Sequence, residues 1–399
     1  MHHLAGTPVA NRGKNVPYFT PHRSFSLFNL RGGFHLPPAA RIMWNQTRVS
    51  RTLGIEYPIL QGPFGGNLSS VKLVSTVSNL GGMGGYGAYM LTPNEIVALD
   101  KELKEATAKP YNINLWVSDS DQTSGEVSEE AYEKAAALVK PFFDELGAPL
   151  PAKPKAYPSR FENQVEALLA TRPPVFSFIF GVPSQTILDD FRKKGIKLIG
   201  NATTLDEAIA LENAGVDVII ASGFEAGGHR PSFLESAEAS LTGTFVLVQQ
   251  IREKVKTPVV AAGGIADARG MAAALTLGAE GVQIGTAFLA TEESGASEYH
   301  RNLLHSDAAR YTTLTKVSTG RLGRGIRSRF TETLAGRNDE LLPFPLQNQF
   351  IVPLRKAATE KQQYDLIMFW GGQIAPNLKH TSAKKLFETI VEEVPVFLR

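Results

Sequence analysis

The residues best suited to acid–base chemistry occur in residues 221–231, which read Ala-Ser-Gly-Phe-Glu-Ala-Gly-Gly-His-Arg-Pro. This segment follows the apolar run 216–220, which is typical of a buried strand. Glycine lets a backbone approach a ligand closely, and histidine has the side-chain pKa nearest neutrality. The pattern predicts a ligand cradle in which Gly227 and Gly228 lie against a ligand and His229 moves a proton.

Two more glycine-containing turns follow apolar runs later in the chain. Gly263 and Gly264 come after residues 258–262, and Gly285 and Thr286 end the run that begins at residue 281. Small residues at such strand ends leave backbone N–H groups free, and in barrels this is the usual place for a phosphate. Either turn alone is also explained as a tight connection. The two together favour phosphate binding.

Other strand ends offer contacts for a flat ligand. Residues 61–66 read Gln-Gly-Pro-Phe-Gly-Gly, and Asn112 and Asn114 alternate along residues 111–117. Alternation places both asparagines on one face of that strand, and we expect Asn114 to contact the ligand. Ser222, at the end of another strand, is a second candidate donor. The alternatives are a buried structural amide for Asn114 and a turn cap for Ser222.

Several polar and aromatic residues have less defined expectations. Glu225 either tunes His229 or binds a lid residue, and its role is left open. Residues 370–373, Trp-Gly-Gly-Gln, are expected to pack across the mouth of the barrel and to touch the ligand. Tyr311 and Lys316 are weaker candidates for substrate contact. Two histidines of the C-terminal segment are assigned to the surface: His300 and His305.

Short apolar strands alternate with amphipathic helices from residue 53 onward. The eight strand candidates are residues 57–61, 83–88, 111–117, 175–180, 197–200, 216–221, 258–262 and 281–285. Between them lie helical patterns such as that after Thr92, where Thr and a Glu three residues later form a capping signal. The count and spacing predict an α/β protein with a (β/α)₈ TIM barrel, with a doubly wound sheet as the alternative.

Three segments depart from this alternation of strands and helices. Residues 118–160 contain a charged helix and a proline-rich stretch, which we interpret as a lid inserted into a barrel spanning residues 44–294. Residues 295–399 are expected to be a mostly helical segment on the barrel mouth. Residues 1–50 carry six Arg or Lys residues and no Asp or Glu. A basic segment without acidic residues is typical of a presequence, which is the alternative. Its proline and glycine content and its weak helical periodicity favour a disordered extension over residues 1–43, upstream of a natural start at Met43.

The bulk composition excludes several classes of protein. With 43% hydrophobic and 20% charged residues, the chain of 399 residues has an ordinary globular composition. The absence of cysteine excludes disulfides, iron–sulfur clusters, zinc–thiolate sites and a cysteine nucleophile, and we predict no metal site. A net charge of +2 is too small to indicate a nucleic-acid partner. No apolar run reaches the length of a membrane span.

The central motifs resemble those of a known family. Residues 224–230 (Phe-Glu-Ala-Gly-Gly-His-Arg), 262–266 (Ala-Gly-Gly-Ile-Ala) and 281–289 (Gly-Val-Gln-Ile-Gly-Thr-Ala-Phe-Leu) resemble nitronate monooxygenase, the FMN-dependent family formerly called 2-nitropropane dioxygenase, in its class I form. Residues 318–330, 345–348 and 370–373 are similar to the C-terminal part of that family. The resemblance covers about residues 44 to 399.

The resemblance implies a TIM barrel with FMN at the carboxyl ends of the strands. It implies that His229 is the catalytic base and that the glycine turns hold the phosphate. The family often has glutamine where Ser222 stands, which weakens that one contact. The residues we assign to cofactor binding are Pro63, Phe64, Gly65, Asn114, Ser222, Gly227, Gly228, Gly263, Gly264, Gln283, Ile284, Gly285 and Thr286.

The resemblance also implies a reaction. Alkyl nitronates such as propionate 3-nitronate would be oxidised with O₂, through a flavin semiquinone, to a carbonyl compound and nitrite or related nitrogen oxides. We expect a cytoplasmic protein with small-molecule partners only, either a monomer or a homodimer. The nearest alternative is an FMN-dependent enoyl-ACP reductase using NAD(P)H, which also carries a Glu-Ala-Gly-Gly-His motif. A third possibility is a flavin-binding barrel without turnover.

Overall fold

The computed structural model describes residues 43–118, 127–155 and 159–398. The expected N-terminal extension therefore lies, apart from Met43, outside the described residues. Two stretches of the expected insertion, residues 119–126 and 156–158, lie outside them as well.

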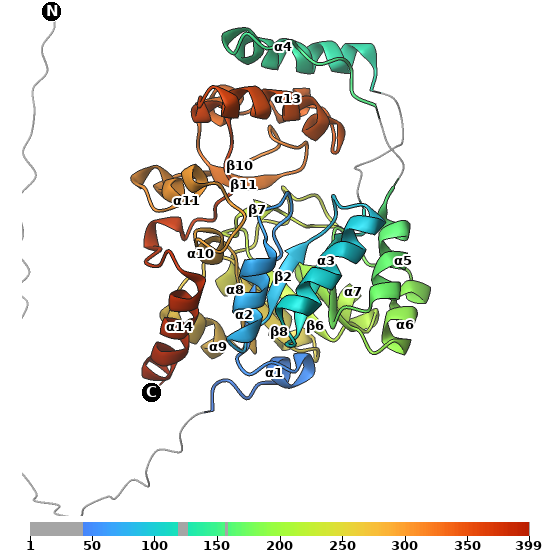
Figure 1. The fold of residues 1–399 in the computed structure, drawn as a ribbon, viewed down its shortest axis with the longest axis vertical. Helices are drawn as coiled ribbons and strands as arrows, with labels where there is room; N and C mark the ends of the chain where they lie inside the picture. Colours follow the sequence, from blue (N-terminus) through green and yellow to red (C-terminus); the bar gives the residue numbers. More distant parts are fainter. Residues whose placement is uncertain (1–42, 119–126, 156–158, 399) are drawn as a thin grey trace, which may run out of the picture. The chain divides into compact units, whose positions relative to one another are not determined.

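Eight parallel strands form the centre of the molecule (Figure 1). Their order is β1-β9-β8-β6-β5-β4-β3-β2, and a parallel bridge between Leu60 and Met83 joins the two edges. The sheet thus closes on itself, which confirms the predicted (β/α)₈ barrel and excludes the open doubly wound sheet. The strands are β1 (Ile59–Gln61), β2 (Gly84–Gly87), β3 (Tyr111–Trp116), β4 (Val175–Ile179), β5 (Lys197–Ala202), β6 (Val218–Ser222), β8 (Val259–Ala262) and β9 (Gly281–Ile284).

Helices follow the strands in the order that the sequence pattern predicts. They are α2 (Val71–Asn79), α3 (Pro93–Ala106), α5 (Phe161–Thr171), α6 (Gln185–Lys193), α7 (Leu205–Asn213), α8 (Thr244–Lys254) and α9 (Ala268–Thr276). The predicted capping signal is present at α3, where the Thr92 side chain accepts from the Glu95 N–H and the Glu95 carboxylate accepts from the Thr92 N–H. Such reciprocal bonds satisfy two N–H groups that a helix start leaves unpaired.

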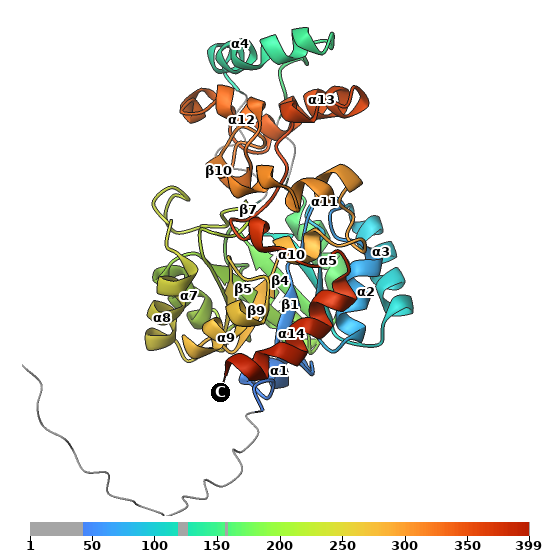
Figure 2. The same cartoon turned by 90° about the vertical axis from the view of Figure 1, so that its left-hand side faces the viewer.

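The eighth outer helix comes from the end of the chain. After β9 the chain forms the single-turn α10 (Thr286–Leu289) and leaves the barrel, returning only with α14 (Ala383–Phe397). Figure 2 shows α14 alongside α9 and α2. Its buried residues Leu386, Phe387 and Ile390 belong to the same hydrophobic core as the strands. The segment expected to begin at residue 295 thus contributes a helix to the barrel itself.

Two apolar layers surround the strands. The larger lies between strands and helices and includes Ile113, Leu115 and Phe176. The smaller lies inside the barrel, where Val49 and Leu53 of α1 (Arg48–Leu53) meet strand residues such as Leu60. Alternation along each strand assigns successive side chains to the two layers. The amino end of the barrel is therefore packed, and polar side chains collect toward the carboxyl end.

A second core lies beyond the carboxyl ends of the strands. It joins α4 (Glu129–Glu145) of the expected insertion to α12 (Arg329–Thr333) and α13 (Leu346–Glu360), with Phe143, Phe330 and Phe350 among its buried residues. Figures 1 and 2 both show α4 and α13 on the side of the barrel where β7 lies. The insertion therefore packs with the C-terminal segment.

A three-stranded antiparallel sheet covers the same end of the barrel. Its order is β10 (Thr312–Thr315), β11 (Gly323–Ile326) and β7 (Gly228–His229). The sequence pattern predicts a mostly helical C-terminal segment and misses this sheet, because β7 is too short to show alternation. The remaining elements are α11 (Glu298–Leu304) and the 3₁₀ turns η1 (Asp307–Arg310), η2 (Asn338–Glu340), η3 (Tyr364–Leu366) and η4 (Ala375–Asn377).

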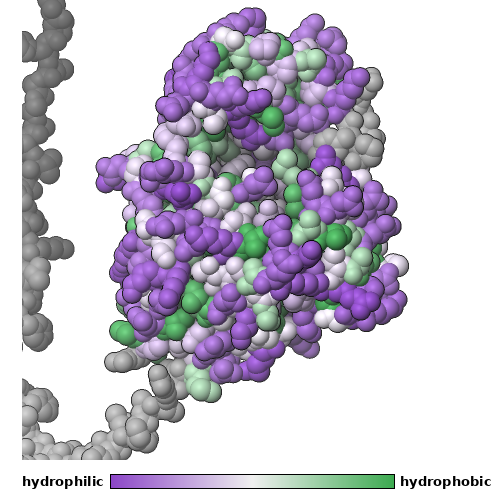
Figure 3. All heavy atoms as spheres, viewed as in Figure 1, coloured by the Kyte–Doolittle hydropathy of each residue, from purple (hydrophilic) through white to green (hydrophobic). Residues whose placement is uncertain are grey.

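One face of the molecule is mostly polar. On the face drawn in Figure 3, hydrophilic residues dominate and hydrophobic ones form small separate patches. Within the described ranges, every helix is too short or too polar to cross a membrane.

Candidate active site

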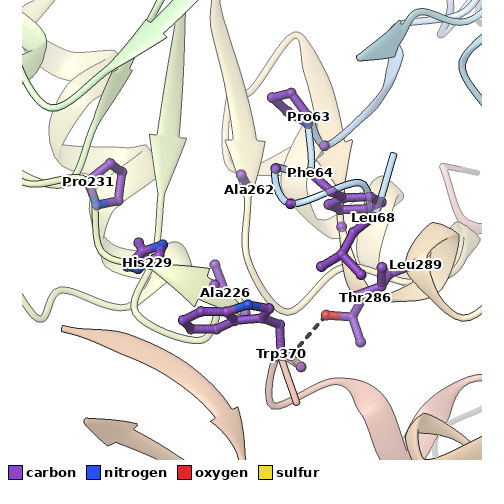
Figure 4. Close-up of a pocket in the computed structure, with 18 of the residues that line it drawn as sticks. Pro63, Phe64, Leu68, Ala226, His229, Pro231, Ala262, Thr286, Leu289 and Trp370 are labelled. Carbon is purple, nitrogen blue, oxygen red and sulfur yellow. Dashed lines mark hydrogen bonds between the residues drawn. The ribbon is translucent and has the colours of Figure 1, made fainter. Parts of the chain in front are cut away.

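A cavity of about 610 Å³ lies at the carboxyl ends of the barrel strands. Barrel loops form one side of it, and residues from α11, α13 and the loop around Trp370 form the other (Figure 4). Ligands of (β/α)₈ enzymes bind at this end of the barrel. The predicted residues that line the cavity are Pro63, Phe64, Gly65, Asn114, Ser222, Gly227, Gly228, His229, Gly263, Gly264, Gln283, Gly285 and Thr286.

Ile284 is the one residue assigned to cofactor binding that does not line the cavity. Its side chain is fully buried in the core between strands and helices. The neighbouring Gln283 lines the cavity instead. Successive side chains on a strand point to opposite faces, so a side-chain contact from both residues is geometrically excluded.

The glycine turns after β8 and β9 present backbone donors to the cavity. Gly263 and Gly264 have φ angles of 107° and 71°, which only glycine adopts without strain. Across the part of the chain that the structure describes, the N–H groups of Gly264 and Gly285 reach no acceptor. Unpaired backbone N–H groups facing a cavity are suited to an anionic ligand.

Glu225 has a role at a helix start rather than beside His229. Its carboxylate accepts hydrogen bonds from the Thr244 N–H at 3.0 Å and from the Thr244 hydroxyl at 3.0 Å. Helix α8 begins at Thr244, and its N-cap residue Gly243 has no side chain to supply this bond. A carboxylate at a helix N-terminus satisfies free N–H groups and favours the helix dipole. Glu225 thus fixes the loop between β6 and β7 to α8.

Polar side chains gather at the inner end of the cavity. The amides of Asn112 and Asn114 both donate to the Ser177 hydroxyl, each at 2.8 Å, so the two asparagines share the inner face as alternation predicts. Asn114 lines the cavity and Asn112 does not. Asn201, at the end of β5, also lines the cavity, and its Oδ1 is buried without a partner among the described residues. An unpaired buried oxygen is available to a ligand donor.

The position of His229 depends on pairing with the C-terminal segment. Gly228 and His229 form β7, which pairs with Arg324 and Gly323 of β11. The Nε2 atom of His229 lies 2.9 Å from the hydroxyl oxygen of Thr319. That hydroxyl in turn lies 3.3 Å from the Arg321 carbonyl oxygen, which can accept its single proton. This arrangement favours Nε2 as a donor and leaves Nδ1 as the atom that accepts a proton.

The surroundings of His229 are aromatic and cationic. The centroid of its ring lies 5.1 Å from that of Trp116 and 4.7 Å from that of Trp370. Burial, together with the positive charges of Arg321 and Arg355, lowers the pKa of His229 to about 3. His229 is therefore neutral at pH 7, at the cationic end of the cavity.

The loop around Trp370 closes the cavity over the glycine turns. Gly372 N–H donates to the Thr286 hydroxyl at 2.9 Å, and Gln373 N–H donates to the Glu225 carbonyl at 3.0 Å. In Figure 4 the Trp370 ring lies between His229 and Thr286. Trp370 lines the cavity, as expected for a residue at the mouth.

His300 corrects a sequence prediction. We expected it on the surface, but it is 3% exposed, lines the cavity and bonds through Nε2 to the Trp370 carbonyl at 2.7 Å. Burial lowers its pKa to about 4, so at neutral pH the ring is uncharged and donates this bond. The prediction failed because the Trp370 loop that covers His300 comes from a distant part of the chain. His305 is exposed, as predicted.

Two weaker candidates lie outside the cavity. Tyr311 is 63% exposed, and Lys316 forms an ion pair with Glu238 at 2.7 Å; neither lines the cavity. Sequence reasoning also missed further lining residues, and those with polar or aromatic side chains include Tyr89, Trp116, Asn201, Thr319, Asn348 and Arg355. Asn201 had a usable signal, because it follows a predicted strand directly. Trp116 had one as well, because alternation places it on the same strand face as Asn112 and Asn114. The others have no local signal, since distant segments bring them to the cavity.

Comparison with known proteins agrees with this architecture. The family model described as nitronate monooxygenase matches residues 46–393. A probable nitronate monooxygenase from Staphylococcus saprophyticus is 39% identical over 349 residues, which cover 87% of this chain and 97% of that protein. A counterpart of the same description from Staphylococcus aureus is 38% identical over 355 residues, covering 88% and 98%.

Solved structures with the same fold are similar over most of the chain. Nitroalkane oxidase from Streptomyces ansochromogenes is similar with a TM-score of 0.79 and 31% identity, over 88% of this chain and 99% of that one. FabK from Thermotoga maritima is similar with a TM-score of 0.67 and 29% identity, over 88% and 96%. From the family match, the fold and the cavity at the strand ends, the chain belongs to the nitronate monooxygenase family of flavin-dependent oxidoreductases.

Proposed function

We propose that this protein binds FMN and uses O₂ to oxidise alkyl nitronates to a carbonyl compound and nitrite or related nitrogen oxides. The observation that carries the proposal is the polarity of one cavity. Unpaired backbone donors and positive-φ glycines lie at one end, and a neutral histidine among cations lies at the other. The first end suits a cofactor phosphate, and the second suits a small anionic substrate.

The residues of the glycine turns fit the phosphate of FMN. Gly264 and Gly285 offer N–H groups without another acceptor in the described ranges. A Cβ at Gly263 would lie 2.8 Å from the Thr244 hydroxyl, so this turn cannot carry a side chain without displacing its neighbours. Backbone donors of this kind bind phosphate without a dedicated basic side chain.

The inner end of the cavity fits a flat polar ring. The side chains of Asn114, Ser222 and Gln283 line it from three different strands, with Gly227 on the loop after β6. We assign to these residues the hydrogen bonds that would orient the isoalloxazine ring. When bound, FMN supplies the redox chemistry, taking electrons from the substrate and passing them to O₂.

His229 favours the nitronate over the neutral nitroalkane as substrate. A base whose conjugate acid has a pKa of about 3 removes a proton from carbon poorly at neutral pH. A nitronate has already lost that proton, so its oxidation needs no strong base. The Trp116 and Trp370 rings beside His229 exclude water from the reacting end.

Oxygen consumption tests this proposal directly. The purified holoenzyme is supplied with propyl-1-nitronate or with neutral 1-nitropropane at the same concentration, and O₂ uptake and nitrite are followed. We expect turnover with the nitronate and much slower turnover with the nitroalkane. Equal rates would contradict the role given to His229, and no O₂ uptake with either would contradict the function.

The alternative of an FMN-dependent enoyl-ACP reductase keeps one supporting observation, the likeness to FabK from Thermotoga maritima. That likeness is more distant than the likeness to nitroalkane oxidase by TM-score, 0.67 against 0.79. The two functions differ in their electron donor, so oxidation of NADH by the protein would favour the reductase.

A further inference from the structure

One cation in the cavity wall has no counter-charge to account for it. Arg355 lies on α13, outside the barrel, and lines the cavity together with Asn348 of the same helix. Its Nη2 donates to the Asn348 side-chain oxygen at 2.7 Å. Within the described ranges, no carboxylate comes within ion-pair distance of Arg355. Asn348 holds the guanidinium without neutralising it.

Holding this charge inside the protein has a cost. Burial lowers the pKa of Arg355, which means that the fold destabilises its charged form. Buried cations are normally paired, and an unpaired one is a candidate for ligand binding. Glu225 is the only acidic side chain lining the cavity among the described residues, and Thr244 already occupies its carboxylate. The charge of Arg355 is therefore uncompensated inside the cavity.

The positive charge of Arg355 affects His229, which lines the same cavity. Its charge is one of the causes that lower the pKa of His229. Arg355 lines the cavity, and among the described residues it is not one with a fully buried, partnerless polar atom, so the N–H groups that Asn348 leaves unused keep exposed surface. A guanidinium offers donors in a planar fork, which matches an anion with two oxygen atoms in a plane.

We propose that Arg355, oriented by Asn348, binds a planar two-oxygen anionic group of the substrate and thereby selects anionic over neutral substrates. This inference rests on the proposed function, because it concerns the nitronate oxidation assigned to the same cavity. The group is either the nitronate itself or a carboxylate on the same molecule, since both present two coplanar oxygen atoms. His229 is neutral and favours Nδ1 as an acceptor, so the anion depends on Arg355.

The first experiment measures anion binding without turnover. Sodium propionate is titrated into the wild-type holoenzyme and into Arg355→Met, Arg355→Lys and Lys356→Met, and flavin absorbance and tryptophan fluorescence are followed. Trp116 and Trp370 line the cavity and serve as reporters. Lys356 is the matched control, because it is the next residue on α13 and is exposed. Flavin content and melting temperature identify any variant that fails to fold.

Losing a charge-assisted hydrogen bond weakens binding by about 10- to 100-fold. We expect this loss of propionate affinity in Arg355→Met. The loss should be smaller in Arg355→Lys, which keeps the positive charge but lacks the planar pair of donors, and absent in Lys356→Met. Wild-type propionate affinity in a folded Arg355→Met variant would overturn the inference. So would equal losses in Arg355→Met and Lys356→Met, which would indicate a general charge effect.

Turnover then identifies the group that is bound. With propyl-1-nitronate and propionate 3-nitronate as substrates, an equal fall in kcat/KM for both in Arg355→Met assigns Arg355 to the nitronate. A fall for propionate 3-nitronate alone assigns it to the carboxylate, and no fall for either overturns the inference. If the wild type oxidises neither substrate, the proposed function fails, and the propionate titration still decides whether Arg355 binds anions.

A pH profile separates substrate binding from a merely structural role. Removing the positive charge of Arg355 removes one cause of the lowered pKa of His229, so that pKa rises. The acid limb of kcat in Arg355→Met should move to higher pH, and that of Lys356→Met should not. An unmoved acid limb in a variant with weakened binding would place Arg355 away from His229 and contradict this geometry.

Discussion

Replacing Gly227 with alanine should loosen the loop that closes the cavity. A Cβ at this position would lie 2.6 Å from the Gly372 nitrogen and 2.7 Å from the Gly371 carbonyl carbon, both backbone atoms that cannot rotate away. Moving the nearer contact to between 3.0 and 3.4 Å requires a shift of about 0.4 to 0.8 Å. That shift strains the bonds from Gly372 N–H to the Thr286 hydroxyl and from Gln373 N–H to the Glu225 carbonyl.

The size of the effect follows from these contacts. Overpacking of this kind costs about 1 to 3 kcal/mol, and each weakened hydrogen bond contributes at most about 1 kcal/mol. We expect Gly227→Ala to lower the free energy of unfolding by about 2 to 4 kcal/mol, which lowers Tm by roughly 3 to 5 °C for a folded body of this size. Its affinity for FMN should fall as well, because Thr286 lies in the proposed phosphate site.

Thermal unfolding and FMN titration measure the two effects. The control is Gly270→Ala on α9, where the nearest atom to the added Cβ lies at an ordinary 3.4 Å and a helix favours alanine. A Gly227→Ala protein with the wild-type Tm and flavin affinity would refute the reasoning, because it would mean that the Trp370 loop moves to accommodate the added Cβ without losing stability.

Three other predictions concern the histidines. His229→Asn should keep FMN and reduce nitronate turnover, because the ring lies between Trp116 and Trp370 at the reacting end of the cavity, and full activity would remove His229 from the mechanism. Thr319→Val removes the partner of His229 Nε2, so kcat should fall while FMN binding stays; an unchanged kcat would show that the ring is oriented otherwise. The pKa of His300 is about 4 in the fold against 6.5 unfolded, so the unfolded chain binds the extra proton and stability falls as pH drops from 6.5 toward 4. His300→Gln should make the free energy of unfolding less dependent on pH, by about 1.4 kcal/mol per pH unit in this range. Denaturant unfolding at pH 7.5 and pH 5 measures this dependence, and an unchanged difference between the two pH values would exclude His300 as its source.

The barrel was predictable because its signals are local. Alternation and apolar runs identify β3 and β6 from a few neighbouring residues, and the Thr92 capping signal needs only four. One topological rule then adds long-range information, since parallel strands in a barrel place their carboxyl ends together. Residues that follow different strands, such as Asn114 and Gly264, could therefore be assigned to one cavity from sequence alone.

The other side of the cavity was not predictable in this way. The pairing of His229 with Gly323 joins segments that are distant in the chain, and β7 is only two residues long. His300 is buried because the Trp370 loop covers it. Arg355 resembles any arginine on an amphipathic helix until α13 is placed beside the barrel. In each case, the polar side chain is buried by a segment that is distant in the sequence, so the residues next to it in the chain do not predict its burial.

The most direct test of the central claim is an anaerobic titration of the purified protein, followed by flavin absorbance, with propionate 3-nitronate in one cuvette and NADH in another. The account predicts a bound flavin that is released as FMN, a spectrum that changes with the nitronate and a spectrum that NADH leaves unchanged. Bleaching by NADH would contradict the assignment and favour the reductase. No flavin spectrum after FMN is added would contradict the assignment of the glycine turns to a phosphate.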